Sequence, residues 1–337
     1  MFVIHAGLHK TGSTAIQRSF AGTQSDLFHY LGWRRANHSD LSVLLFAQAP
    51  EKYWVFQREG RTKDEMQAWR KKAMARVQRD FETNRGKTHI FSAEQLAKAT
   101  PEAVARMQAF FAPFADPFKV IIYVRPAQSY MESMAQQRIR TGSTDIKLIW
   151  PDYRASIEKF DQVFGEKAVE VRQYNPDAIQ GWDAVSDFSE AIGVRLPVDQ
   201  QFLVNTAMGA RHAALVLDRR AGLGGPPHGT KAVRADQEFL TSVLPQPSPP
   251  FRLDPAGLDA KVANHSDDLA WIKDRLGGVS MDQSLVRRSQ DVVFSSTQDA
   301  LDYAQECMAP RNQLLPGGRA REFAGRIKRR ILRGLSM

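Results

Sequence analysis

The first fourteen residues constrain the fold of this chain more than any other segment. Residues 2–5, Phe-Val-Ile-His, favour a β-strand, and a loop with two glycines and a lysine follows at residues 6–12. Ser13 and Thr14 then open a stretch that favours a helix. A strand, a glycine-bearing loop and a helix N-terminus bind phosphate, because the unpaired backbone N–H groups of the first helical turn point toward an anion. We expect a phosphate-bearing ligand here; the alternative is a tight strand-to-helix turn without one.

The loop differs from the Walker A motif, G-x-x-x-x-G-K-[ST], at one important position. Gly7 and Gly12 have the required separation, but Ser13 stands where the lysine belongs, and the lysine is found at Lys10. A Walker lysine follows the second glycine so that it reaches the β- and γ-phosphates of a nucleotide. The displaced lysine argues against an ordinary ATP- or GTP-hydrolysing loop. A P-loop-type nucleotide kinase or NTPase with an atypical loop remains an alternative.

A second motif lies far along the chain. Residues 118–124, Phe-Lys-Val-Ile-Ile-Tyr-Val, are typical of a strand buried on both faces of a parallel sheet. The run ends at Arg125, and Pro126 follows at a position where proline starts a helix. Ser133 lies eight residues after the arginine, with Ser129 one turn earlier on the same helix face. A guanidinium at a strand end grips phosphate through its planar fork; the alternative is a core strand capped by a solvent-paired arginine.

Together the two motifs resemble sulfotransferases that use 3′-phosphoadenosine 5′-phosphosulfate (PAPS). Five residues are similar to the 5′-phosphosulfate loop of that family: Lys10, Thr11, Gly12, Ser13 and Thr14. Arg125 and Ser133 are similar to its 3′-phosphate motif. The resemblance implies a bacterial, carbohydrate-sulfotransferase-like enzyme that moves a sulfuryl group from PAPS to an acceptor hydroxyl or amine. It further implies 3′-phosphoadenosine 5′-phosphate (PAP) as the product, no metal, and a carbohydrate or glycolipid as the acceptor.

The resemblance also assigns catalytic residues. Residues 87–94 favour a strand that ends in Ser-x-Glu, as in bacterial sulfotransferases of this type. Glu94 is then the expected general base, and Lys10 is expected to stabilise charge on the departing phosphate oxygen. A carboxylate that caps the helix beside it is the alternative for Glu94. His9 and His5 flank the loop and are the other candidate bases, since histidine titrates near neutral pH.

The likeness extends over roughly the first two hundred residues. Residues 168–174, followed by a helix at 181–192, resemble the family's next strand-and-helix unit, which implies that Tyr174 stands near the nucleotide. The chain departs from the family in two respects. The aromatic residue that often follows the first loop and packs on adenine is absent, and so is the C-terminal Arg-Lys-Gly phosphate loop of the cytosolic branch.

Apolar strands alternate with amphipathic helices along this part of the chain. The alternation predicts an α/β fold of three layers, with a mainly parallel sheet, a P-loop-like phosphate-binding turn and helices on both faces. Ligands of such sheets bind beyond the carboxyl ends of the strands. Lys10, Glu94, Arg125 and Tyr174 all follow predicted strands, so we expect one cleft to gather them.

The domain organisation follows from changes in composition. We assign residues 1–244 to a sulfotransferase-like α/β domain with a helical insertion at about 34–85, near the acceptor side. Within the insertion, residues 62–83 favour a long, charged helix. A solvated helix that packs its apolar stripe is the alternative for that insertion. Residues 245–255 form a proline-rich linker, because clustered prolines exclude helix and central strand. Residues 256–337 are predicted to form a helical C-terminal extension.

Positive charge is concentrated at the end of this extension. Residues 319–333 contain seven basic residues and one glutamate, and therefore supply six of the nine net positive charges of the chain. A basic helix with a narrow apolar stripe lies on an anionic membrane surface, and we favour this partner over nucleic acid. A solvated tail is the alternative. A basic membrane- or nucleic-acid-binding protein with a purely structural loop is thus a further functional alternative.

The remaining features predict a cytoplasmic protein, peripheral at the inner membrane surface if the tail binds there. The sequence has no run of eighteen apolar residues and no secretory signal at its start. Its single cysteine, Cys307, cannot form an internal disulfide. No cluster of cysteine or histidine predicts a metal site.

Overall fold

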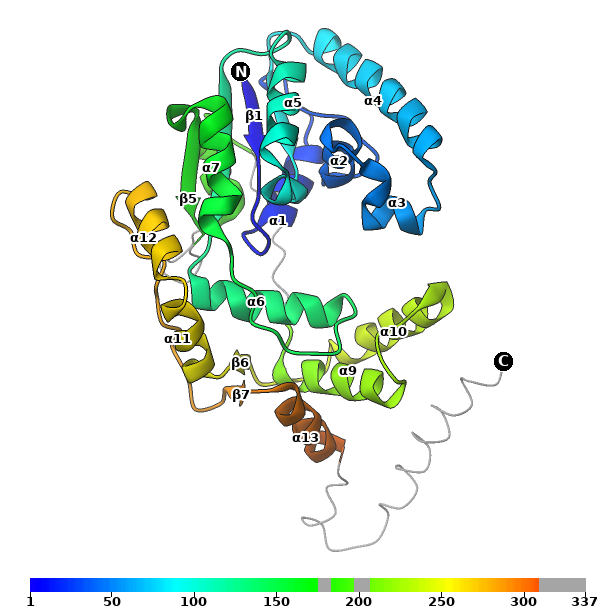
Figure 1. The fold of residues 1–337 in the computed structure, drawn as a ribbon, viewed down its shortest axis with the longest axis vertical. Helices are drawn as coiled ribbons and strands as arrows, with labels where there is room; N and C mark the ends of the chain where they lie inside the picture. Colours follow the sequence, from blue (N-terminus) through cyan, green and yellow to red (C-terminus); the bar gives the residue numbers. More distant parts are fainter. Residues whose placement is uncertain (175–182, 197–206, 309–337) are drawn as a thin grey trace, which may run out of the picture. The chain divides into compact units, whose positions relative to one another are not determined.

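The computed structural model describes residues 1–174, 183–196 and 207–308 (Figure 1). The chain divides into two compact units. The first comprises Met1–Ala135, Lys147–Ala207 and Pro255–Arg287, and the second comprises Gln136–Ile146, Met208–Asp254 and the described part of Arg288–Met337. The predicted boundaries at residues 244 and 255 stay a prediction. The predicted basic tail at 319–333 lies outside the described residues.

A five-stranded parallel sheet forms the centre of the first unit. The strands lie in the order β2-β3-β1-β4-β5, and each neighbouring pair is parallel. In chain order they span Phe2–His5, Phe28–Tyr30, Thr88–Ser92, Phe118–Val124 and Val169–Gln173. Strand β1 is central, with His5 opposite Ser92 of β3 and Ile121 of β4. The predicted α/β fold with a mainly parallel sheet is therefore confirmed.

Most α-helices of the first unit lie between these strands along the chain, and the last three follow β5. Its α-helices span Ser13–Ala21 (α1), Ser39–Phe46 (α2), Trp54–Arg58 (α3), Lys63–Thr83 (α4), Pro101–Phe111 (α5), the first part of Ala127–Arg140 (α6), Tyr153–Phe164 (α7), Ala184–Ala191 (α8), Pro255–Ala263 (α11) and Ser266–Arg275 (α12). Its 3₁₀ helices span Pro50–Lys52 (η1), Glu94–Lys98 (η2) and Glu166–Ala168 (η3).

Helices cover both faces of the sheet, as predicted. Successive strand residues point to opposite faces, and β1 shows this alternation. Val3 belongs to a buried cluster with Phe20 of α1 and Phe188 of α8. Phe2 points the other way, and its ring centroid lies 4.4 Å from that of Phe111 on α5. The sheet is thus the middle layer of three.

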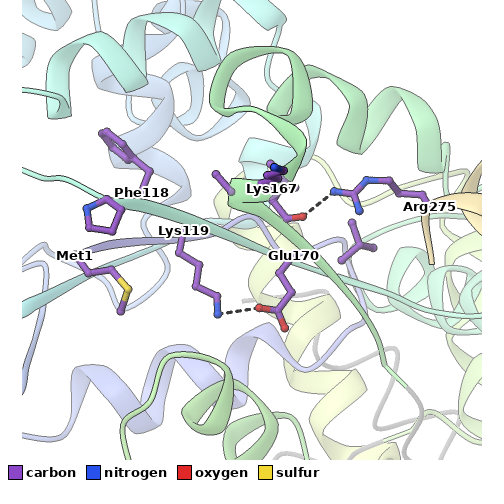
Figure 2. A pocket seen from close by; sticks show the side chains of 10 residues that line it. Met1, Phe118, Lys119, Lys167, Glu170 and Arg275 are labelled. Carbon is purple, nitrogen blue, oxygen red and sulfur yellow. Dashed lines mark hydrogen bonds and ion pairs between the residues drawn. The ribbon is translucent and has the colours of Figure 1, made fainter. Parts of the chain in front are cut away.

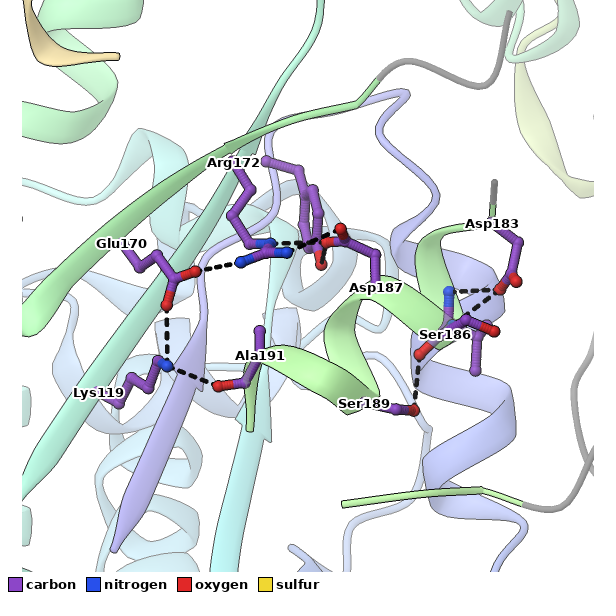
Figure 3. A network of polar contacts seen from close by, with 10 residues as sticks. Lys119, Glu170, Arg172, Asp183, Ser186, Asp187, Ser189 and Ala191 are labelled. Carbon is purple, nitrogen blue, oxygen red and sulfur yellow. Dashed lines mark hydrogen bonds and ion pairs between the residues drawn. The ribbon is translucent and has the colours of Figure 1, made fainter. Parts of the chain in front are cut away.

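A network of charged groups fastens α8 to strands β4 and β5 (Figure 3). Lys119 Nζ donates to Glu170 Oε2 at 2.8 Å and to the carbonyl oxygen of Ala191 at 2.5 Å. Arg172 donates to Glu170 and, at 2.6 Å, to Asp187 of α8. The hydrogen bonds to Asp187 and Glu170 raise the pKa of the Arg172 guanidinium, so that this cation stays charged. These contacts hold α8 on the sheet at Asp187 and Ala191, which matters for the loop after β1 because Ala184 of α8 lies next to Gly12.

The predicted insertion contains α2, α3 and α4. The helix expected over residues 62–83 is confirmed as α4, which begins after Thr62 with a capping box. The Thr62 hydroxyl accepts from the backbone N–H of Glu65, and the Glu65 carboxylate accepts from the N–H of Thr62. Phe81 near the end of α4 packs against Phe2, with ring centroids 5.3 Å apart, which anchors the helix on the sheet.

The second unit is smaller. It contains the end of α6, helices α9 (Ala210–Gly222), α10 (Gly229–Val243) and α13 (Thr297–Met308), and a parallel pair of strands, β6 (Phe251–Leu253) and β7 (Val292–Phe294). Its core holds a buried ion pair. Arg220 donates to Asp236 at 2.6 Å and to the carbonyl oxygen of Ser143 at 2.7 Å, so the buried guanidinium is well paired.

Among the helices of the described residues, none combines the length and apolar character that crossing a bilayer requires.

Candidate active site

The loop between β1 and α1 is a compact turn with several unpaired backbone N–H groups. Lys10 and Gly12 both adopt left-handed conformations, with φ of 69° and 80°. The Thr11 hydroxyl donates to the carbonyl oxygen of Leu8 at 2.6 Å and closes the loop on itself. Within the described chain, the backbone N–H groups of residues 11–14 donate to no acceptor. Four N–H groups at the start of a helix are thus available to an anion.

Neighbouring atoms lie so close to Gly7 and Gly12 that neither position has room for a side chain. A Cβ atom on Gly7 would lie 2.2 Å from Ser13 Oγ. A Cβ atom on Gly12 would lie 2.6 Å from Ala184 Cβ and 3.0 Å from Tyr174 Cε2. The helix α8 and the end of β5 therefore press on the loop and define its shape.

Two buried polar atoms under the loop have no hydrogen-bond partner among the described residues. They are Ser13 Oγ and His5 Nε2, and both lie beside Gly7. His5 Nδ1 lies 2.7 Å from Ser92 Oγ, which also accepts from Gln17 Nε2 at 3.2 Å. The Ser92 hydroxyl can then donate to Nδ1, which leaves the proton of a neutral imidazole on Nε2. Orphaned buried donors are costly, and an anionic oxygen in the loop would satisfy them.

The imidazole of His5 is an unsuitable proton acceptor at neutral pH. Its side chain is fully buried between the sheet and α8, with its ring 5.3 Å from Phe188. Burial lowers the pKa of His5 to about 3. Among the candidate bases, His5 is thereby placed beneath the loop rather than beside an approaching acceptor.

Arg125 lies against the same loop. Its Nη1 donates to the carbonyl oxygen of Lys10 at 3.2 Å, and its Nε donates to Ser129 Oγ at 2.5 Å. The guanidinium carbon lies 5.5 Å from the centre of the Tyr174 ring, within the range of a cation–π contact. Strands β1, β4 and β5 are neighbours, so their carboxyl ends bring these side chains together.

Ser133 lies on α6, two helical turns beyond Arg125. It is half-buried on α6, and no hydrogen bond joins it to Arg125 within the described residues. Ser129, one turn earlier, is the serine that accepts from the guanidinium. Thr14 is exposed at the start of α1.

Glu94 and His9 meet on the other side of β1. Glu94 is the first residue of η2, directly beyond β3, and its Oε2 lies 3.4 Å from His9 Nδ1. Their side chains are 22% and 27% exposed, so an acceptor can reach them. The structure thus pairs two of the candidate bases and separates both from His5.

Sequence reasoning missed the polar residues that support the site from below. Gln17 is buried on α1, one turn after Ser13, and Ser92 is fully buried at the end of β3. A polar residue on the apolar face of a helix is the signal that could have found Gln17. Ser92 was noted only as part of a motif, because its partners are distant in sequence.

A cavity of about 460 Å³ lies at the opposite edge of the sheet, where β4 and β5 begin (Figure 2). Three of its charged lining residues, Lys119, Glu170 and Arg275, already have partners. Lys119 binds Glu170 at 2.8 Å, and Arg275 donates to Asp161 at 3.0 Å and to the Val169 carbonyl oxygen at 2.7 Å. Parallel sheets bind ligands at their carboxyl edge, so this cavity is not the candidate active site.

Within the described residues, no group of three or more His, Cys, Asp or Glu side chains could hold a metal ion.

Comparisons with known proteins find similarity in structure alone. No family model and no curated protein sequence matches the chain. A sulfotransferase from Alicyclobacillus acidocaldarius aligns with a TM-score of 0.36 and 16% identity, over 76% of this chain and 98% of that one. The sulfotransferase domain of the Synechococcus PCC 7002 olefin synthase aligns with a TM-score of 0.37 and 12% identity, over 59% and 75%. The sulfotransferase domain of the curacin biosynthetic pathway aligns with a TM-score of 0.34 and 14% identity, over 74% of this chain and 98% of that one. At these TM-scores the likeness carries no functional conclusion.

Proposed function

We propose that this chain transfers a sulfuryl group from PAPS to an acceptor hydroxyl or amine. One observation carries the proposal: Arg125 Nη1 donates to the carbonyl oxygen of Lys10, so that two motifs 115 residues apart form one site. The backbone N–H groups of the loop would bind one anionic group, and the Arg125 guanidinium would bind a second one. A nucleotide with phosphate groups at both its 5′ and 3′ positions suits this pair.

The residues present fit the 5′ end of such a donor at the loop. Backbone N–H groups of residues 11–14 would hold the phosphosulfate, with the exposed Thr14 at the rim. The orphaned Ser13 Oγ and His5 Nε2 would gain acceptors from the same anion. The side chain of Lys10 would stabilise negative charge on the phosphate oxygen that leaves sulfur.

The 3′-phosphate would be held by Arg125, with Ser129 fixing the guanidinium. Binding there positions the donor and takes no part in the bond changes. Tyr174 would lie beside the nucleotide, since its ring contacts both Gly12 and the guanidinium. The role of Ser133 as a further phosphate contact stays a prediction.

The transfer itself needs one base and one in-line displacement. Glu94 accepts the proton of the acceptor hydroxyl while the hydroxyl oxygen forms a bond to sulfur. The bond between sulfur and the 5′-phosphate oxygen breaks, and PAP leaves with that electron pair. His9, 3.4 Å from Glu94, orients the carboxylate or takes over the proton.

Titration calorimetry with PAP, AMP, and ATP with Mg²⁺ tests the donor. We expect PAP to bind at least about tenfold more tightly than AMP, because AMP leaves the Arg125 position empty. Arg125→Gln should abolish this difference and weaken PAP by roughly 2–4 kcal/mol. Arg18→Gln removes an equal charge from exposed α1 and serves as the control. Equal affinities for PAP and AMP, or tighter binding of ATP with Mg²⁺, would contradict the proposal and favour a nucleotide kinase or NTPase.

A further inference from the structure

The insertion of the first unit contains a second cavity that the donor does not use. It has a volume of about 290 Å³ and is lined by Trp33, Arg34, Trp69, Lys72, Ala73 and Arg76. Four of the six residues lie on α4, at spacings of three and four that place them on one helical face. The other two follow β2, so the cavity lies between α4 and the segment that leads into α2.

The two tryptophans that form the aromatic wall of this cavity are fixed by contacts with neighbouring residues. The rings of Trp33 and Trp69 are nearly parallel, with an interplanar angle of 23° and centroids 6.1 Å apart. The indole N–H of Trp33 donates to Asp40 Oδ1 at 3.1 Å, and the edge of Phe56 packs on Trp69 at 5.5 Å. Both indoles are therefore oriented before any ligand arrives, which reduces the entropy lost on binding.

The charged wall carries an excess of cations. Arg34 is paired with Asp40 at 2.5 Å and with Glu59 at 2.9 Å. Lys72 and Arg76, by contrast, have no carboxylate partner among the described residues, and both are exposed. They lie four residues apart on one face, where like charges repel each other. No carboxylate lines the cavity, so an anion placed there would relieve this repulsion.

A short chain of contacts connects the cavity with Glu94. Asp40, which holds Trp33, lies in the first turn of α2. The residue before it, Ser39, accepts the backbone N–H of Gln95 at 3.0 Å, next to Glu94. His38 is fixed at the same place, because its Nδ1 accepts the backbone N–H of Ser92 at 3.1 Å. The start of α2 therefore contacts the aromatic wall through Asp40 and the residue after the candidate base through Ser39.

We propose that this cavity binds the acceptor, and that the acceptor is an anionic molecule with a six-membered ring. Guanidinium groups of Arg34 and Arg61 lie over the Trp69 ring, and that of Arg76 lies over the Trp33 ring. The ligand ring would therefore pack against the parts of both indoles that line the cavity, with its carboxylate or other anionic group beside Lys72 and Arg76. The role as acceptor rests on the proposed sulfuryl transfer, which needs a hydroxyl or amine. A uronic-acid sugar and a hydroxylated aromatic acid share this chemistry, and direct binding distinguishes them.

The test measures binding to the full chain without PAPS, by calorimetry and by quenching of tryptophan fluorescence. The probes are a glucuronic-acid disaccharide, its neutral glucose counterpart and 4-hydroxybenzoate. We expect at least one of the two anions to bind about tenfold more tightly than the neutral sugar. The anion that binds more tightly identifies which source the cavity accepts.

Matched charge variants locate the binding. Lys72→Gln with Arg76→Gln should weaken the bound anion about tenfold, while Lys71→Gln with Arg79→Gln should change its affinity less than about twofold. The control pair removes the same two charges from exposed positions of α4 outside the cavity. Equal losses in both pairs, or no preference for either anion over the neutral sugar, would overturn the proposal.

Titration with PAP separates this proposal from the one on which it rests. If PAP binds but neither anion does, the acceptor cavity is refuted and the proposed transfer stands. If an anion binds in the cavity while PAP does not bind, the anion site stands and its role as an acceptor site is refuted.

Discussion

Single residues decide whether the loop after β1 can hold an anion. Gly12 has a φ of 80° and touches α8, so two separate constraints exclude a side chain there. Arg125 and Lys10 are joined through a backbone carbonyl, which couples the loop to the neighbouring strand. The proposed chemistry therefore depends on a few close contacts, and each can be tested by one substitution.

Gly12→Ala should abolish PAP binding and lower the free energy of unfolding by about 1–3 kcal/mol. The added methyl would lie 2.6 Å from Ala184 Cβ, which forces the loop and α8 apart. Gly86→Ala is the control, because Gly86 has a φ of 86° but no atom within 4 Å of its Cβ position. That variant should lose stability alone. Calorimetry with PAP and urea unfolding measure both quantities, and unchanged PAP affinity in Gly12→Ala would contradict the assigned site.

Glu94→Gln should reduce kcat by about 10²–10⁴-fold, since it removes the proton acceptor and keeps the shape of the side chain. PAP affinity should stay unchanged, because Glu94 lies on the acceptor side of β1. Glu102→Gln, at the exposed start of α5, is the control. Full activity of Glu94→Gln in a sulfuryl-transfer assay would leave Glu94 as the first residue of η2 with no chemical role. His9→Asn would then be the next variant to measure.

At the scale of elements, α4 is the helix on which the proposed acceptor site depends. Its first turn is held by the capping box between Thr62 and Glu65, and Trp69 follows one turn later. The hydrogen bonds at the N–H of Thr62 and at its hydroxyl are strong enough to lower the pKa of the Glu65 carboxyl. Loss of the cap should therefore lower both the affinity of the cavity for its ligand and the free energy of unfolding.

Thr62→Ala should lower the free energy of unfolding by about 0.5–2 kcal/mol and weaken the anionic ring ligand severalfold. Thr100→Ala is a matched control, since Thr100 caps α5 through the N–H of Ala103 and has no part in the cavity. It should cost similar stability and leave ligand affinity unchanged. Equal effects of both variants on the ligand would mean that the cavity responds only to global stability.

For the molecule as a whole, buried histidines predict a marked sensitivity to acid. Burial lowers the pKa of His5 to about 3 and the pKa values of His38 and His89 to about 4. In the unfolded chain these groups titrate near about 6.5. Between these values, the unfolded chain binds protons that the folded chain does not. The free energy of unfolding should therefore fall as pH drops below about 6.5, by up to about 1.4 kcal/mol per pH unit for each histidine.

Urea unfolding at several pH values between about 7.5 and 5 measures this slope. His38→Asn should reduce this slope by the contribution of one histidine, up to about 1.4 kcal/mol per pH unit. A free energy of unfolding that stays constant over this range would mean that the buried histidines bind protons as readily in the folded protein as in the unfolded chain.

Local patterns were sufficient to identify the elements that carry the site. The strand and helix around residues 2–14, the strand at 118–124 and the helix at 62–83 were all predicted, because hydrophobic periodicity and capping depend on near neighbours. The position of Lys10 and Arg125 beyond parallel strands followed from the same reasoning. The phosphate-binding role of the loop stays a prediction.

Contacts between distant segments were decided only by the tertiary structure. The order β3-β1-β4 places His9 beside Glu94 and Lys10 beside Arg125. Packing of α8 on β1 buries His5, and so turns a candidate base into a support for the loop. Partner choices of this kind depend on how whole elements pack, and side-chain spacing along the chain does not encode them. The sequence alone therefore determined which chemical groups stand at the strand ends, and the packing of strands and helices determined which of them act together.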